Sequence, residues 1–208
     1  MLEEKISDIF NILSKSHPDA FCELIYSSPF ELLVAIILSA QCSDKRVNLC
    51  TENLFKHYNK PTDFMSLSID ELKPYIFSCG FYNNKAKSLI EMSKSLVENF
   101  NGVIPKTLEE LLTLKGVGRK TASVLLSVAF DIPAMPVDTH VFRVSRRLGL
   151  SNGKTPEKVE SDLMALFSKD KWNSLHHFLI FHGRYVCHSR KPNCGECELN
   201  KYCLNEFK

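Results

Sequence analysis

Apolar residues recur along most of the chain with the period of an α-helix. They fall at i, i+3 and i+4 spacing between residues 6 and 13, and again between residues 86 and 100. Residues 30–40 are apolar on every side, which predicts a helix buried in the middle of a domain. No alternation of apolar and polar residues is long enough to indicate a strand. We therefore predict an all-α protein with about ten helices.

Sequence signals also mark where helices begin and where they are interrupted. Ser68-Ile69-Asp70-Glu71 and Thr107-Leu108-Glu109-Glu110 have the spacing of a capping box. Thr155-Pro156 puts a proline at the first position of a further helix. Pro133 and Pro136 break the chain between two helical stretches. We expect the chain to cross there from one helical lobe to another.

Four of the eight cysteines lie close together, at positions 187, 194, 197 and 203. Four thiolates in so short a stretch can surround one metal centre. The spacing differs from the repeated C-x2-C of a zinc ribbon and from the C-x2-C-x2-C-x3-C of bacterial ferredoxins. A single 4Fe–4S cluster fits, with tetrahedral zinc and a pair of disulfides as the alternatives.

Composition and charge restrict the setting of the protein. No basic segment followed by an apolar one suggests a signal or transit peptide, so we expect a reducing cytoplasm, where disulfides are rare. The longest apolar run, Leu32 to Leu38, is too short to cross a membrane. The formal net charge is +2. Residues 1–114 are net negative and residues 115–208 net positive, which suits DNA or, alternatively, is an ordinary solvated surface.

A glycine-containing turn separates two predicted helices near the middle of the chain. The helix from Thr107 to about Leu114 runs into Gly116-Val117-Gly118, and another helix follows from Thr121. Two glycines allow a positive φ and bring the backbone close to a ligand. The free N–H groups of the second helix would then favour a phosphate. Arg119 and Lys120 add positive charge there, although a helical hairpin without a ligand remains the alternative.

Several segments combine into a resemblance that covers essentially the whole chain. They are the hairpin with Lys120, Val137-Asp138-Thr139-His140, Leu38-Ser39-Ala40-Gln41, His182-Gly183-Arg184-Tyr185 and the four C-terminal cysteines. Together they resemble the endonuclease III family, the iron–sulfur members of the helix-hairpin-helix DNA glycosylases. The chain departs from the family in carrying Lys115 where the turn usually has proline. The backbone N–H groups of the turn remain, so we expect DNA binding to survive.

The resemblance implies two all-α lobes with DNA bound between them. Residues 18–133 would form a helical barrel domain with the helix-hairpin-helix at about 107–128, and residues 1–17 plus 134–208 the cluster domain. It also implies a 4Fe–4S cluster held by Cys187, Cys194, Cys197 and Cys203. The expected partner is double-stranded DNA with an oxidised pyrimidine or an abasic site. We expect a monomer in the cytoplasm, associated with the nucleoid, with no membrane contact.

The implied activity is that of a bifunctional DNA glycosylase and abasic-site lyase of base excision repair. Lys120 matches the family nucleophile, which removes the base through an imine and then cleaves the strand 3′ by β-elimination. Asp138 matches the second catalytic residue. Their plainer roles would be a phosphate-binding lysine and a helix N-cap. Mismatch glycosylases without lyase activity lack a lysine at position 120, and a non-catalytic DNA-binding iron–sulfur protein would not need this pair.

The resemblance also implies residues that contact DNA. Gln41 and Phe81 match the residues that fill the gap left by a flipped nucleotide, with a loop hydrogen bond and a core aromatic as their plainer roles. We expect Gly116, Gly118, Arg119, Arg190 and Lys191 to contact phosphates. Ser39, Asp44 and His140 are expected to line the base pocket. The histidines at 176, 177 and 182 are interpreted as packing or surface residues rather than metal ligands.

Overall fold

A computed structural model describes residues 2–204. Within that part of the chain it contains eleven α-helices, two short 3-10 helices and no strand, which confirms the predicted all-α class. The chain forms two compact units, Glu23–Ile132 and Met1–Cys22 with Pro133–Lys208. The predicted domain boundaries remain a prediction, and residues 1 and 205–208 of the expected cluster domain lie outside the described residues.

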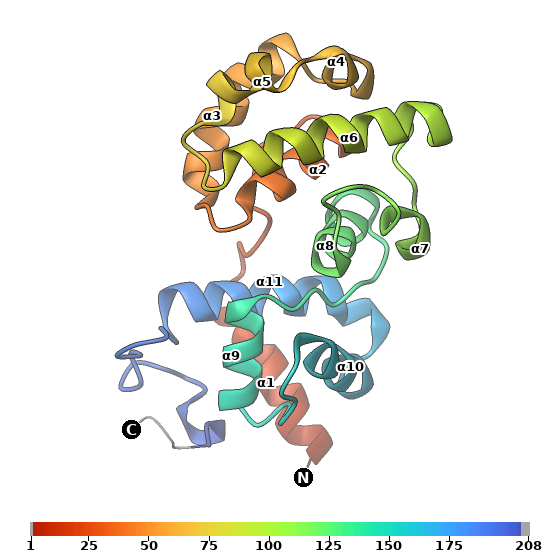
Figure 1. Cartoon of the computed structure of the whole chain (residues 1–208). Helices are drawn as coiled ribbons and strands as arrows, with labels where there is room; N and C mark the ends of the chain where they lie inside the picture. Colours follow the sequence, from red (N-terminus) through yellow and green to blue (C-terminus); the bar gives the residue numbers. More distant parts are fainter. Residues whose placement is uncertain (1, 205–208) are drawn as a thin grey trace. The chain divides into compact units, whose positions relative to one another are not determined.

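The unit Glu23–Ile132 is built around a helix that is buried on all sides. Every residue from Phe30 to Leu38 is buried, as the apolar run predicts. This helix, α2, packs against α3, α6 and α8, while α4 and α5 pack along α6 (Figure 1). The helices of this unit are α2 (Pro29–Ser39), α3 (Asp44–His57), α4 (Pro61–Ser66), α5 (Ile69–Ile76), α6 (Tyr82–Phe100), α7 (Leu108–Leu111) and α8 (Arg119–Phe130).

Hydrogen bonds at the helix starts explain several of these boundaries. The Ser68 side chain accepts from the Glu71 N–H at 3.2 Å, and the Glu71 carboxylate accepts from the Ser68 N–H at 2.8 Å. The predicted capping box is therefore confirmed. Ser28 caps α2 in a simpler way, since its hydroxyl accepts from the Glu31 N–H at 3.2 Å. These bonds satisfy N–H groups that have no partner within the helix.

The unit Met1–Cys22 with Pro133–Lys208 joins the two ends of the sequence. Its helices are α1 (Leu2–Ser16), α9 (Thr139–Arg147), α10 (Pro156–Leu166), η1 (Lys169–Lys171), α11 (Trp172–Tyr185) and η2 (Asn200–Tyr202). Ile9 and Leu13 of α1 bury themselves in a core shared with α9, α10 and α11. The Phe10 ring meets Phe178 edge-on, with centroids 5.7 Å apart. The apolar stripe of the first helix thus anchors the N-terminus to the C-terminal half of the chain.

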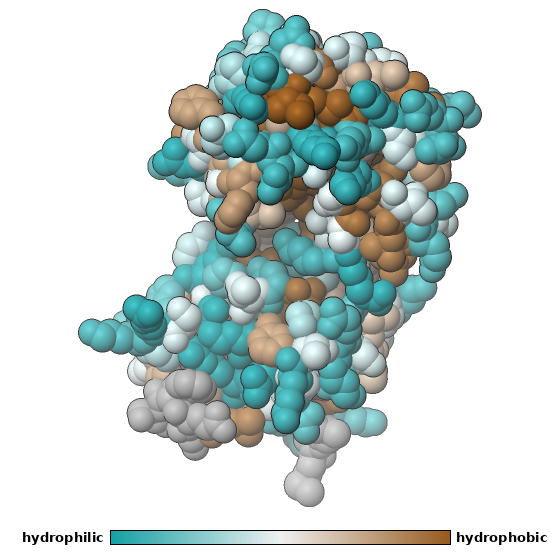
Figure 2. All heavy atoms as spheres, in the orientation of Figure 1, coloured by the Kyte–Doolittle hydropathy of each residue, from teal (hydrophilic) through white to brown (hydrophobic). Residues whose placement is uncertain are grey.

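The face of the molecule in Figure 2 is mostly hydrophilic. Apolar side chains appear on it in separate patches bordered by polar ones (Figure 2). Across the described residues, no helix has both the length and the apolar character needed to cross a membrane.

Candidate functional site

The predicted hairpin lies between α7 and α8. Helix α7 ends at Leu111, three residues before the predicted end, and a turn follows. Gly116 has a φ of +77°, and a Cβ there would lie 2.8 Å from the Ser88 Cβ, so only glycine fits. Gly118 has an ordinary φ of −93°, so the turn uses the positive φ that glycine allows only at Gly116.

The space around Gly118, at the start of α8, is open. It is the N-cap residue, and a Cβ at this position would meet nothing within 4 Å. Arg119 and Lys120 are the first two residues of the helix, and both are exposed. The helix N-terminus therefore presents N–H groups and two cationic side chains to solvent, an arrangement that favours an anion.

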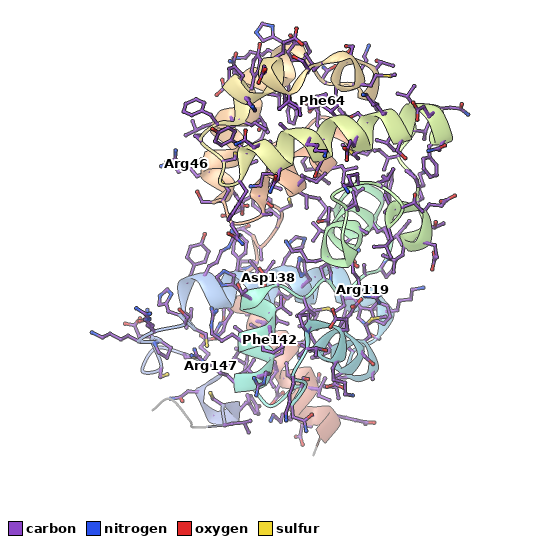
Figure 3. The ribbon with its side chains drawn as sticks, viewed as in Figure 1. Arg46, Phe64, Arg119, Asp138, Phe142 and Arg147 are labelled. Carbon is purple, nitrogen blue, oxygen red and sulfur yellow. The ribbon has the colours of Figure 1, made fainter. Side chains whose placement is uncertain are left out.

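Asp138 occupies the start of α9 (Figure 3). Its Oδ1 accepts hydrogen bonds from the N–H groups of His140 and Val141, both at 2.8 Å. The N-cap role is confirmed. Since both bonds end on one oxygen, the cap fixes the orientation of a half-buried carboxylate.

The three residues expected at the base pocket lie in different units. Ser39 and Asp44 belong to Glu23–Ile132, where the Ser39 hydroxyl donates to the Ile36 carbonyl at 2.8 Å and Asp44 begins α3. His140 belongs to the other unit, and burial lowers its pKa while Asp138 opposes the shift. Its Nδ1 lies 3.2 Å from the Arg143 guanidinium. Because arginine only donates, this nitrogen accepts.

Gln41 and Phe81 share an unusual backbone conformation. Their φ angles are +55° and +59°, in the left-handed region that residues other than glycine rarely adopt. Both residues are exposed, and Phe81 leaves 66% of its surface open to solvent. The alternative of a core aromatic at position 81 is therefore wrong.

The four C-terminal cysteines line one cavity, together with His182, Val144 and Leu148. All four are free thiols, so the alternative of a disulfide pair is not observed. Among the described residues, no three His, Cys, Asp or Glu side chains close around a single ion. Burial raises the pKa of Cys197, and the Leu199 N–H opposes that shift. Four thiolates around one cavity are the ligand set that an iron–sulfur cluster takes.

Two arginines of α9, Arg143 and Arg147, hold this cysteine loop, and neither was predicted from the sequence. Arg147 Nη1 donates to Cys187 Sγ at 3.2 Å and to the His188 carbonyl at 2.7 Å, and Nη2 donates to Ser189 at 3.1 Å (Figure 3). Arg143 donates from Nε to the Cys187 carbonyl at 3.1 Å. Their spacing of four residues places them on one helix face, which is the signal that could have found them.

The loop held by these arginines carries the expected phosphate contacts. Arg190 and Lys191 are both exposed, and Lys191 has a φ of +51°. The hydrogen bonds from Arg147 and Arg143 thus fix the backbone that carries Arg190 and Lys191. Exposed cations on a fixed backbone suit contacts with phosphate.

Two of the three histidines on α11 confirm the packing interpretation. His176 is buried, and its Nδ1 lies 2.8 Å from the Pro136 carbonyl. His182 is buried with Nε2 3.6 Å from Cys197 Sγ, and burial lowers its pKa to about 4. A neutral His182 therefore packs directly against one of the four thiols.

Comparison with known proteins identifies the class. Residues 34–169 match the model of the HhH-GPD superfamily base excision DNA repair proteins. Residues 187–203, from the first to the last of the four cysteines, match the iron–sulfur binding domain of endonuclease III. The chain belongs to the HhH-GPD superfamily of base excision DNA repair proteins.

Similar proteins narrow the class to one family, endonuclease III. The chain is 47% identical to endonuclease III of Rickettsia prowazekii, covering 100% of this chain and 99% of that protein. It is 47% identical to endonuclease III of Bacillus subtilis (96% and 89% covered) and 42% identical to that of Escherichia coli K12 (100% and 98% covered). The protein is accordingly a DNA glycosylase with abasic-site lyase activity that carries a 4Fe–4S cluster.

Solved structures agree with the observed fold. A trapped endonuclease III–DNA covalent intermediate superimposes with a TM-score of 0.94 at 43% identity, covering 97% of this chain and 95% of that one. A thermostable thymine-DNA glycosylase superimposes with a TM-score of 0.87 at 21% identity, covering 97% and 96%. The second likeness shows the fold alone.

Proposed function

We propose that the protein binds duplex DNA containing an oxidised pyrimidine or an abasic site and that Lys120 forms an imine with the damaged nucleotide. The observation that carries this proposal is the exposed Lys120 at the first turn of α8, directly after the open backbone of Gly118. A phosphate bound at this helix N-terminus would bring a sugar within reach of the amine. The similar endonuclease III that was trapped as a covalent DNA intermediate supports the same chemistry.

The reaction proceeds in two steps that balance atoms and charge. The neutral Lys120 amine attacks C1′, the bond to the base breaks, and the base leaves with the electron pair and takes a proton. Opening of the sugar ring, with a proton going to the ring oxygen O4′, gives an iminium between Lys120 and C1′. Loss of a C2′ proton then breaks the C3′–oxygen bond and releases the 3′ phosphate. Water finally hydrolyses the remaining imine, which frees the Lys120 amine and leaves an unsaturated aldehyde on the sugar. The iminium accepts the electron pair of the C2′–H bond, which is why an amine serves as nucleophile here.

Asp138 stabilises the positive charge that develops on the sugar and moves protons between amine and sugar. The hydrogen bonds at Oδ1 support this role because they orient the carboxylate before substrate binds. His140, two residues after Asp138, is a proposed contact of the extruded base, as are Ser39 and Asp44. A base inside a duplex is out of reach of such groups, so the nucleotide has to flip out.

Gln41 and Phe81 would fill the space that the nucleotide leaves. Their exposure supports this role, since a buried side chain could not enter a base stack. Gly116, Gly118 and Arg119 would bind a phosphate at the hairpin, and Arg190 and Lys191 another at the cysteine loop. We further expect a monomer located in the cytoplasm with the nucleoid.

Cys187, Cys194, Cys197 and Cys203 would hold the cluster, and its binding would order the C-terminal loop. Arg147 and Arg143 hold the same loop through its backbone carbonyls. The role that we assign to this region is to present Arg190 and Lys191 to DNA.

The first test is borohydride reduction during incubation with duplex DNA that contains one oxidised pyrimidine. We expect a covalent complex on a denaturing gel, and its loss in Lys120→Ala. Lys115→Ala is the matched control, an exposed lysine at the other end of the same turn, and should keep the complex. A complex that persists in Lys120→Ala would show that another amine reacts.

Asp138→Asn tests the second catalytic residue. Asparagine is also a good N-cap, so the fold and DNA affinity should change little. We expect kcat to fall at least about 100-fold, the usual scale for loss of an acid–base group. A fall in DNA affinity in step with kcat would contradict the assigned role.

A further inference from the structure

One lysine of the unit Glu23–Ile132 is buried. Lys85 on α6 is only 7% exposed, and its Nζ donates to the Leu38 carbonyl at 2.8 Å and to the Ala40 carbonyl at 2.7 Å. Lysine is almost never buried without partners, because its charge loses the stabilisation of water. These two carbonyls lie at the C-terminal end of α2, where a helix carries partial negative charge.

The two carbonyls belong to the segment that leads into Gln41. Ala40 is the C-cap of α2, and the next residue, Gln41, adopts the left-handed conformation. The Lys85 ammonium therefore fixes the backbone immediately before the residue proposed to enter the DNA. The Cys79 thiol interacts electrostatically with Lys85, and burial raises the pKa of Cys79 to about 12.

Lys85 is also bonded to the second gap-filling segment. Its backbone N–H donates to the Phe81 carbonyl at 3.1 Å, which closes the first turn of α6. Phe81 is the N-cap of that helix in the left-handed conformation, with no side-chain cap bond. One residue thus holds the Gln41 segment with its side chain and the Phe81 segment with its backbone.

The segment that contains Gln41 lies close to the segment that contains Gly80 and Phe81. A Cβ built on Gly80 would lie 3.4 Å from the Gln41 carbonyl oxygen. Gln41 and Phe81 are both exposed, so contacts of their own side chains do not enforce the uncommon φ angles. A left-handed conformation persists where the surrounding structure imposes it. We infer that the hydrogen bonds from Lys85 to Ala40 and Phe81 help to impose this conformation.

We propose that Lys85 is a positioning residue. It holds the backbone of Gln41 and Phe81 so that both side chains enter the gap left by a flipped nucleotide. The inference rests on the proposed function, in which these two side chains fill that gap. Lys85 acts through the two segments and does not touch DNA, because its ammonium is turned inward onto the carbonyls.

The test compares strand cleavage on two substrates that differ only in the opposite strand. One is a duplex with a single abasic site, and the other is the same abasic strand unpaired. Gap filling matters only in the duplex, whereas imine formation at Lys120 is needed for both. We expect Lys85→Met to lower the single-turnover rate on the duplex at least about tenfold more than the rate on the single strand.

Two further variants complete the comparison. Lys85→Arg keeps charge and donors and should recover part of the duplex rate. Lys87→Met is the matched control, since Lys87 is on the same helix with its side chain 64% exposed, and it should behave as wild type. If Lys85→Met does not fold, as judged by helical circular dichroism, Lys85→Gln replaces it, because glutamine keeps an N–H donor group without the charge.

Coupling to Gln41 separates positioning from general stability. If Lys85 acts through Gln41, the loss from Lys85→Gln should be clearly smaller in a Gln41→Ala background than in wild type. Equal losses on duplex and single strand, no loss on either, or full additivity with Gln41→Ala would each overturn the inference. A wild-type protein that cleaves neither substrate would instead overturn the proposed function.

Discussion

Each of the two compact units uses a buried cation to hold a functional loop, and the two cations do so differently. In Glu23–Ile132, the Lys85 ammonium donates to two carbonyls at the end of α2. In the other unit, the Arg147 guanidinium donates to the Cys187 thiol and to the carbonyls of His188 and Ser189. Both side chains are less than one tenth exposed.

The difference lies in what else supports each loop. The Gln41 segment follows a helix whose residues from Phe30 to Leu38 are all buried, so an apolar core supports its base in addition to Lys85. The stretch 187–203 contains only the short helix η2, and Leu199 is the one apolar side chain of this stretch that is fully buried in the core. The Gln41 segment thus rests on an apolar core with one lysine, whereas arginines and metal ligation together hold the cysteine loop.

The largest expected effect is loss of the cluster in Cys197→Ser. A missing thiolate removes a ligand, so the brown absorption of the purified protein should disappear and amides of 187–203 should exchange freely. Amide protection in Glu23–Ile132 should remain as in wild type. Hydrogen exchange resolved by residue and visible absorption measure both.

Cys22→Ser is the control for this change, since Cys22 lies outside the loop and should leave the absorption intact. A cluster that survives Cys197→Ser would remove Cys197 from the ligand set. Loss of amide protection in both units would show that metal ligation supports both of them.

The next effect is expected from Leu33→Ala in α2. Leu33 is fully buried, and truncation of such a side chain costs about 2–5 kcal/mol of unfolding free energy. The single tryptophan, Trp172, lies in the other unit, so its fluorescence reports there. We expect hydrogen exchange to show destabilisation of Glu23–Ile132, with the fluorescence transition unchanged.

Leu49→Ala is the matched control, because Leu49 is 66% exposed and should change stability by no more than about 0.5 kcal/mol. If the Trp172 transition shifts as far as the exchange data in Leu33→Ala, the two units unfold together. That result would remove the basis for treating their supports separately.

Acidification should lower the free energy of unfolding of the cluster-bearing unit by a smaller amount. Burial lowers the pKa of His177 to about 4, whereas an unfolded histidine titrates near 6.5. Between these values the unfolded chain binds protons that the native one does not, so stability is complete above pH 6.5 and falls as the pH drops towards 4. From pH 7 to pH 5 one such histidine costs up to about 2 kcal/mol, measurable by urea unfolding with Trp172 fluorescence.

His177→Gln should reduce this pH dependence, and His57→Gln, in the other unit, should not. An unchanged pH dependence in His177→Gln would assign the acid sensitivity to other groups.

Local signals predicted much of the fold, and distant partners explain what they did not predict. The capping box at Ser68 and the buried run 30–40 involve neighbours within one or two turns, so periodicity sufficed for both. Lys85 bonds to carbonyls more than forty residues away, which no local pattern reveals. It precedes Ala86 on the buried face of α6, yet lysine is normally expected at the surface.

The candidate site was also predicted only in part. Lys120, Asp138 and the four cysteines were predicted because their sequence spacing follows a family pattern, although their roles remain predictions. Phe81 shows the limit of residue type, since an aromatic is usually core and this one is 66% exposed. Its exposure follows from the left-handed turn before α6, which sequence alone did not indicate.

The smallest expected effects come from two matched helix caps, one in each unit. Ser28 accepts from the Glu31 N–H at 3.2 Å, and Thr155 accepts from the Lys158 N–H at 3.3 Å. Alanine at either position should cost about 1 kcal/mol, because each leaves one helix N–H without its side-chain acceptor. Ser28→Ala should act on Glu23–Ile132 and Thr155→Ala on the Trp172 transition. Equal costs would place the difference between the units in their loops, whereas a much larger cost for Thr155→Ala would mean that the cluster-bearing unit is weaker throughout.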